Sequence, residues 1–148
     1  MQEKNITIKS LRNTDIPVTI VESGKDNAPL VIFAHCFKAD RHEGGRFTDV
    51  ANNLANIGVN SIRMGFAGCD ESKEDFINYT LNNCLDDMES CYKYMLDNYS
   101  IDTSHVGMIG YSMGGRLTSI LSLAEHLLFS QAELRVNPFD PMVIWLEQ

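Results

Sequence analysis

The sequence predicts an α/β fold in which a mainly parallel sheet is flanked by helices. Short apolar runs alternate along the chain with segments of helical periodicity, as is typical of strand–helix–strand units. Residues 30–34, 59–64 and 105–109 lack a regular polar alternation, which favours strands buried on both faces. The chain has 148 residues, no internal repeat and no interdomain linker, so we expect a single domain spanning residues 1–148.

We expect the chain to open with a β-hairpin. Ile6 and Ile8 alternate with polar neighbours, and residues 16–21 form a run rich in β-branched side chains. The Asn-Thr-Asp stretch at residues 13–15 supplies the residue types that favour a turn between them. Residues 30–34 then form the first central strand.

Strands and helices are predicted to alternate from there to the end of the chain. Apolar residues recur at helical spacing over residues 47–55, and residues 113–128 form another helix. Residues 125–141 give no clear pattern beyond that helix, and residues 142–146 make a last short apolar strand. That strand is expected to be an uncovered sheet edge, which predicts self-association as a homo-oligomer through it.

A long helix is predicted over residues 81–99, where an apolar period of 3.6 residues lasts for about five turns. The residues expected to pack on the sheet are Leu81, Leu85, Met88, Tyr92, Met95 and Tyr99. Two cysteines of this helix, Cys84 and Cys91, lie on the same apolar face and are expected to be reduced thiols. Asp86, Asp87 and Glu89 are expected on the solvated face.

Composition argues against several classes of binding partner and cofactor. The formal net charge of −8 disfavours binding to nucleic acid and to anionic lipid surfaces. No apolar run approaches the ~20 residues that span a bilayer, and residues 1–15 lack the apolar core of a secretory signal, so we expect a cytoplasmic protein. No C-x-x-C pair is present, and neither zinc nor another cofactor is expected.

The strongest chemical signal is a G-x-S-x-G string between a predicted strand and a predicted helix. It runs from Gly110 to Gly114 and predicts a sharp turn that presents the hydroxyl of Ser112 as a nucleophile. The N–H of Met113 follows at a helix N-terminus and is placed to stabilise an oxyanion. The second donor of such sites comes from the loop after the first central strand, which here is residues 35–38.

Three motifs in order make the chain resemble the α/β-hydrolase superfamily, and within it the small feruloyl (cinnamoyl) esterases and serine acyl-peptidases. Residues 31–37 (VIFAHCF) resemble that branch's strand ending in His-Gly-Phe, and residues 66–72 (FAGCDES) resemble its Phe-x-Gly-x-Gly-x-Ser loop. Residues 110–115 resemble its nucleophile elbow. The resemblance implies Ser112 as nucleophile and the backbone N–H groups of Phe37 and Met113 as the oxyanion hole.

The chain departs from that branch at three points. Cys36 and Asp70 stand where the branch has glycine, so both turns must accommodate a side chain. The triad acid and histidine of the superfamily follow later strands, and the chain ends near the sixth strand. The resemblance therefore implies a domain that is incomplete at its C-terminus, short of on the order of 60 to 100 residues.

Residues within the chain offer no convincing base or acid. His126 lies about four helical turns beyond Ser112, and His105 opens its strand at the opposite end. The remaining histidines and acids are expected to be structural or solvated: His35 holding its loop, His42 exposed, and Asp40, Glu43, Asp140 and Glu147 without a metal. Two hypotheses stay open, a serine hydrolase acting on small ester or acyl substrates and a non-catalytic binding or assembly module.

Overall fold

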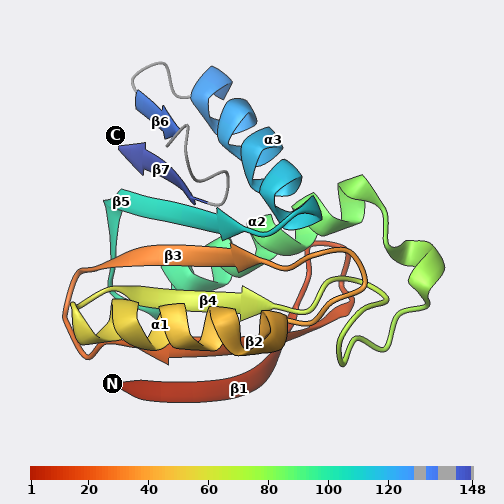
Figure 1. The fold of residues 1–148 in the computed structure, drawn as a ribbon, viewed down its shortest axis with the longest axis horizontal. Helices are drawn as coiled ribbons and strands as arrows, with labels where there is room; N and C mark the ends of the chain where they lie inside the picture. The colour runs from red at the N-terminus through yellow and green to blue at the C-terminus, as the bar shows by residue number, and fades with distance from the viewer. Residues whose placement is uncertain (129–132, 137–142, 148) are drawn as a thin grey trace.

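The computed structural model describes residues 1–128, 133–136 and 143–147, with side chains described as far as residue 123. These residues form one mixed sheet with helices on both faces (Figure 1). In chain order the elements are β1 (Gln2–Lys9), β2 (Asp15–Glu22), β3 (Ala28–Ala34), η1 (Glu43–Gly45), α1 (Arg46–Asn56), β4 (Asn60–Met64), η2 (Phe76–Asn78), α2 (Leu81–Asn98), β5 (Ile101–Gly110), α3 (Met113–Leu128), β6 (Glu133–Val136) and β7 (Val143–Glu147).

The order of strands across the described sheet is β1-β2-β4-β3-β5-β7-β6. The three central strands are parallel, with Ile32 of β3 facing Ile62 of β4 on one side and Met108 of β5 on the other. The outer strands pair antiparallel, and β1 and β2 form the predicted hairpin. The expected α/β fold is therefore confirmed, with its parallel part confined to the centre.

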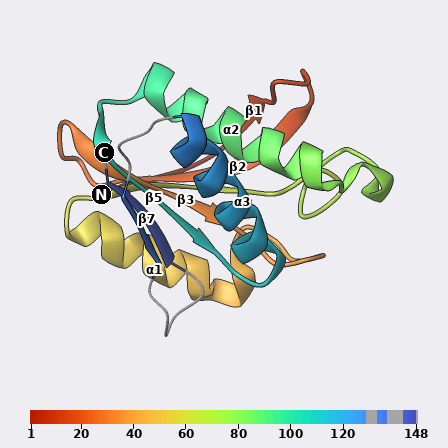
Figure 2. The ribbon, with the colours of Figure 1, turned by 90° about the horizontal axis from the view of Figure 1, so that it is seen from above.

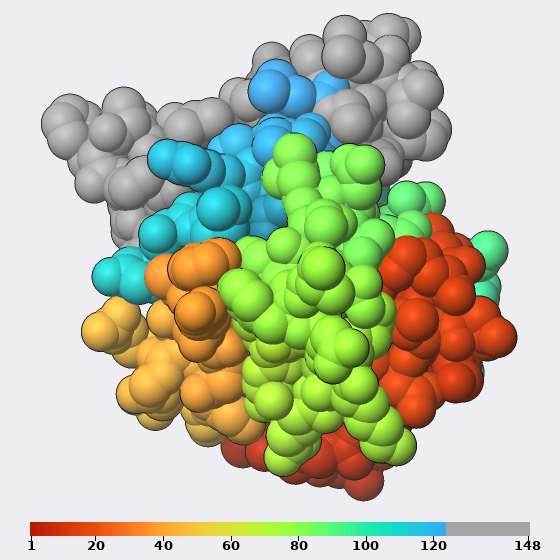
Figure 3. Space-filling view, turned by 90° about the vertical axis from the view of Figure 1, so that its right-hand side faces the viewer, coloured from red at the N-terminus to blue at the C-terminus, as the bar shows by residue number. Residues whose placement is uncertain are grey.

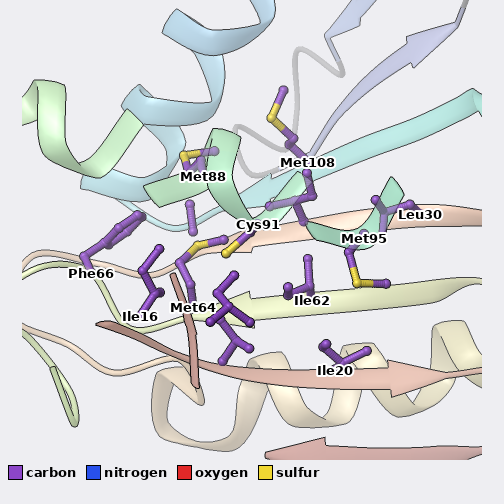
Figure 4. Close-up of a cluster of buried hydrophobic side chains, with 14 of the residues drawn as sticks. Ile16, Ile20, Leu30, Ile62, Met64, Phe66, Met88, Cys91, Met95 and Met108 are labelled. Carbon is purple, nitrogen blue, oxygen red and sulfur yellow. The ribbon is translucent and has the colours of Figure 1, made fainter. Parts of the chain in front are cut away.

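Helices cover the two faces of the sheet unequally. Figure 2 shows α1 on one face and α2 with α3 on the other. The face under α1 holds a small cluster in which Phe33 and Phe47 lie with ring centroids 5.0 Å apart. The larger cluster lies under α2 (Figure 4) and includes Ile20, Ile62 and Met88, which are fully buried. Most of the predicted apolar stripe of α2 therefore packs on the sheet, but the prediction was wrong for Leu81, which is 49% exposed in the first turn of the helix.

The prediction of a solvated acidic face on α2 was wrong for Asp87. This side chain is fully buried, and Asp86 is paired with Arg12 at 2.8 Å between guanidinium nitrogen and carboxylate oxygen. Arg12 comes from the β1–β2 turn, so a partner distant in sequence compensates the buried charge. Glu89 is exposed, as predicted.

The C-terminal strands differ from expectation in their order. β7 pairs antiparallel with β5 and is itself covered by β6, so the outer position at this side of the described sheet belongs to β6. The strand predicted at residues 142–146 is thus present as β7 but is not the edge. Among the described residues, no helix has the length and apolar character needed to cross a bilayer.

Candidate active site

Ser112 lies in a strained turn between β5 and α3. Its backbone φ is +53°, in the left-handed region that non-glycine residues rarely adopt, and its side chain is exposed. Strain of this kind costs on the order of 1–3 kcal/mol and persists where the surrounding structure enforces it. The predicted geometry of the turn is therefore present.

Two glycines of the motif are required by close approach of backbone to backbone. A Cβ on Gly110 would lie 2.3 Å from the carbonyl carbon and oxygen of Gly114. A Cβ on Gly114 would lie 1.9 Å from the carbonyl oxygen of Ala34. The first turn of α3 therefore presses against both β5 and the end of β3, and only glycine fits at either position.

Hydrogen bonds fix the elbow on the end of β3. The N–H of Tyr111 donates to the carbonyl of Ala34 at 3.1 Å, and the N–H of Arg116 donates to the carbonyl of Ser112 at 3.2 Å. Since β3 continues directly into the loop at residues 35–38, the nucleophile turn and this loop share one anchoring point.

His35 holds the loop after β3 from inside the protein. It is fully buried, its Nδ1 lies 2.7 Å from the carbonyl oxygen of Cys36, and its Nε2 lies 3.1 Å from the backbone nitrogen of Phe66. The Phe66 N–H must donate to Nε2, so Nδ1 carries the ring proton and donates to Cys36. Burial lowers the pKa of His35, which keeps this neutral tautomer. The structural role predicted for His35 is confirmed.

The same contact orients the peptide that follows Cys36. In a planar trans peptide, the carbonyl of one residue and the N–H of the next point in opposite directions. Because the Cys36 carbonyl points to the buried His35, the Phe37 N–H points away from it. Among the described residues, neither the Phe37 N–H nor the Met113 N–H is paired with an acceptor, and unpaired backbone N–H groups are the kind of donor that an oxyanion requires.

Two acidic side chains brace this loop. Glu43 accepts a hydrogen bond from the Cys36 N–H at 2.8 Å, and Asp40 accepts from the N–H groups of His42 and Glu43 at 2.7 and 3.1 Å. These carboxylates therefore satisfy backbone donors, and the described residues contain no cluster of metal-ligating side chains. His42 is half-buried beside Thr48 rather than exposed as predicted.

The two departures from the glycine pattern are accommodated in different ways. Cys36 has a negative φ, and the left-handed residue of its loop is Lys38, with φ +56°. Asp70 does adopt the left-handed conformation, with φ +55°, and its carboxylate accepts from the guanidinium of Arg41 at 2.5 Å. Asp is one of the few residue types that tolerate this conformation, and here its carboxylate also links the two loops through Arg41.

Among the described residues, the other histidines and acids that the sequence offers lie away from Ser112. His105 lies within β5, is exposed, and contacts Asp102 at 2.7 Å, five residues before the strand ends. His126 lies in the last turns of α3. Glu147 faces His105 in the antiparallel register, so β7 carries it away from the elbow rather than toward it. Asp140 lies outside the described residues.

Sequence reasoning missed the aromatic side chains beside the loop. Phe37 contacts Phe76 and Tyr79, with ring centroids 5.7 and 5.3 Å apart. Phe76 and Tyr79 precede α2 in a stretch without periodicity, so no pattern marks them. Their exposed apolar surface next to a proposed oxyanion donor is visible only in three dimensions.

Comparison with known proteins agrees with this geometry. The model of the prolyl oligopeptidase family (Peptidase_S9) matches residues 62–147, which contain the elbow and α3. No curated protein matches the sequence.

Similar solved structures share the fold. Est1E from Butyrivibrio proteoclasticus, solved with ferulic acid bound, superposes with a TM-score of 0.73 at 21% identity, over 82% of this chain and 48% of that one. The esterase Pf2001 from Pyrococcus furiosus gives a TM-score of 0.67 at 23% identity, over 79% and 43%. The α/β-hydrolase GrgF from Penicillium sp. sh18 gives 0.74 at 12% identity, over 82% and 42%. The chain thus spans about half the length of these proteins.

Proposed function

The chain belongs to the prolyl oligopeptidase family within the α/β-hydrolase superfamily, and on that premise we propose that Ser112 is the nucleophile of a serine hydrolase acting on carboxylic esters or related acyl compounds. The observation that carries the proposal is the elbow itself. Ser112 is exposed at φ +53°, while Gly110 and Gly114 are packed too tightly for any side chain. The packing holds the strained turn in place and keeps the hydroxyl of Ser112 exposed. An exposed hydroxyl on a rigid turn is what nucleophilic attack requires.

In the proposed reaction, the Ser112 hydroxyl oxygen attacks the acyl carbon of a small ester and loses its proton to a base. The oxygen of the tetrahedral intermediate receives hydrogen bonds from the N–H groups of Phe37 and Met113. Collapse of the intermediate expels the alcohol, which takes a proton from the conjugate acid of the base, and leaves an acyl-enzyme on Ser112. Water then hydrolyses that ester by the same steps.

Within the part of the chain that the structure describes, no histidine is placed in contact with Ser112. His35 uses both ring nitrogens in hydrogen bonds, and His105 and His126 lie far from the elbow. His42 is half-buried and its Nδ1 lies 3.3 Å from the hydroxyl of Thr48. We therefore propose that a histidine from further polypeptide or from a neighbouring subunit completes the site.

A second candidate function follows from the same observation. A chain that keeps the elbow but has no base would bind acyl compounds or a protein partner without turnover. Its surface would still present the loop, the free N–H groups and the neighbouring aromatic rings.

The experiment that separates the two candidates measures the reactivity of Ser112. The purified protein is treated with a fluorophosphonate probe and is assayed with p-nitrophenyl acetate and butyrate. Ser112→Ala removes the nucleophile, and Ser119→Ala serves as the matched control because Ser119 is an exposed serine of α3 bonded to the Gly115 carbonyl. Labelling and turnover lost only in Ser112→Ala support a hydrolase. Equal background in all three proteins supports the non-catalytic candidate.

A further inference from the structure

We infer that the aromatic side chains beside the oxyanion loop bind the acyl part of the substrate, and that Lys38 selects acyl chains ending in an anionic group, such as half-esters of short dicarboxylic acids. The inference rests on the proposed function, because it takes Ser112 as the point where the ester reacts. We call Phe37, Phe76 and Tyr79 the aromatic shelf.

The aromatic shelf is a contiguous apolar surface. Phe76 stacks on Tyr79 with centroids 5.5 Å apart and an angle of 15° between the rings, and Phe37 meets both rings edge-on. Phe37 is 50% exposed and Phe76 is 43% exposed, although both rings are large and apolar. Clustered exposed rings of this kind are typical of sites that bind apolar ligand groups.

The shelf is held by the backbone beneath it. Gly68 has φ +73°, and a Cβ there would lie 2.5 Å from the Cα of Phe76, so the loop after β4 presses directly on η2. Behind the shelf, Tyr79 meets the ring of Phe66, which in turn packs on His35 at 4.6 Å. The shelf is therefore attached to the same buried histidine that holds the oxyanion loop.

Lys38 supplies a positive charge at this surface. Its ammonium lies 4.8 Å from the ring centroid of Phe76 and 5.8 Å from that of Phe37. Cation–π contacts of this kind position an ammonium but leave its N–H groups able to bind an anion. Among the described residues Lys38 forms no salt bridge, in a chain whose formal net charge is −8.

Three acidic side chains near the shelf have other partners. Glu43 binds the Cys36 N–H, and Asp70 and Glu71 bind Arg41. Asp75, at the start of η2, is exposed and lies outside ion-pair distance of Lys38. Burial raises the pKa of Tyr79, so its phenol stays neutral. Lys38 is thus the charge that an anionic ligand on the shelf would meet.

The shelf lies on the same face as the nucleophile. Figure 3 shows the orange atoms of the loop after β3 between the green atoms of the β4–α2 segment and the cyan atoms at the start of α3. A Cβ on Gly114 would lie 2.8 Å from the carbonyl oxygen of His35, and the Cα of Phe37, two residues further along the chain, lies at most about 8 Å from that of His35. An acyl chain that runs from Ser112 past the Phe37 N–H would thus approach the rings of the shelf and the ammonium that lies over them.

Binding without turnover tests the inference. Calorimetric titrations use the Ser112→Ala protein with monomethyl adipate and with methyl hexanoate, which have chains of equal length and differ by the terminal carboxylate. We expect monomethyl adipate to bind about fivefold more tightly at low salt, in the range of exposed ion pairs. The preference should disappear in Lys38→Met and persist in Lys38→Arg, while Phe76→Ala should weaken both ligands.

The outcomes separate the two proposals. Equal binding of both esters, a preference that survives Lys38→Met, or no binding of either ester would overturn the role of the shelf, even if the probe labels Ser112. Absence of labelling together with a Lys38-dependent preference would overturn the hydrolase proposal and leave the shelf as a binding site.

Discussion

The buried carboxylate of Asp87 accepts a hydrogen bond from the backbone N–H of Ala67, with 3.0 Å between oxygen and nitrogen. Its other oxygen accepts from the guanidinium of Arg12 at 2.9 Å. Asp87 belongs to α2, Ala67 to the loop after β4, and Arg12 to the β1–β2 turn. One carboxylate therefore joins three segments beneath the loop that leads to the aromatic shelf.

This anchor makes stability depend on pH. Burial raises the pKa of Asp87 from 3.8 to about 6, against the opposing effects of the Ala67 N–H and Arg12. Between these two values the folded state binds more protons than the unfolded state, so the contribution of Asp87 to the free energy of unfolding falls as pH rises. We expect a fall on the order of 2 kcal/mol between pH 4 and pH 7.

Urea denaturation at several pH values, compared with Asp87→Asn, measures this contribution. The asparagine does not titrate, so the difference between the two proteins isolates residue 87. A difference that is constant from pH 4 to pH 7, or one that grows in favour of the wild type as pH rises, would contradict the prediction.

Substitution of Gly114 tests the packing of the elbow. In Gly114→Ala the added Cβ would meet the backbone oxygen of Ala34 at 1.9 Å, and neither backbone can move without breaking β3 or α3. We expect a loss of about 3 kcal/mol or more in the free energy of unfolding. Gly24→Ala is the control, because Gly24 has φ +84° but open space around it, and it should cost about 1 kcal/mol. Similar thermal stabilities of the two variants would refute the packing argument.

The elbow could be predicted from sequence because its cause is local. Gly110, Ser112 and Gly114 lie within five residues, and the strand before them and the helix after them have their own apolar patterns. The burial of Asp87 could not be predicted from the sequence. It lies next to Met88 on a helix whose buried side is wider than the apolar stripe, and its compensating partner, Arg12, is 75 residues away.

The direction and the neighbours of the C-terminal strands could not be predicted from the sequence either. An apolar run predicts that residues 142–146 form a strand, but it does not determine whether the strand runs parallel or antiparallel to its neighbour. The antiparallel pairing of β7 with β5 depends on the path of the chain between α3 and β7. In this register Glu147 pairs with His105, five residues before the end of β5.

His35 should stay neutral at pH values where an exposed histidine is already charged. Burial lowers its pKa below 6.5, so the unfolded state binds more protons than the folded state as pH falls below that value. The contribution of His35 to stability is therefore full above pH 6.5 and is lost on acidification. NMR titration of the ring protons measures this directly; a midpoint for His35 at or above the ordinary histidine value of about 6.5 would contradict the argument.

Glu43 is expected to position the oxyanion loop without touching a substrate. Its carboxylate accepts from the Cys36 N–H at 2.8 Å, so Glu43→Ala should release that amide, whereas Glu43→Gln keeps an acceptor oxygen at the same place. Hydrogen exchange of the Cys36 amide should accelerate about tenfold in the alanine variant and little in the glutamine variant. If Ser112 reacts with the fluorophosphonate probe, its labelling rate should follow the same order, because the Phe37 N–H belongs to the next peptide. Unchanged exchange in Glu43→Ala would show that His35 alone fixes the loop.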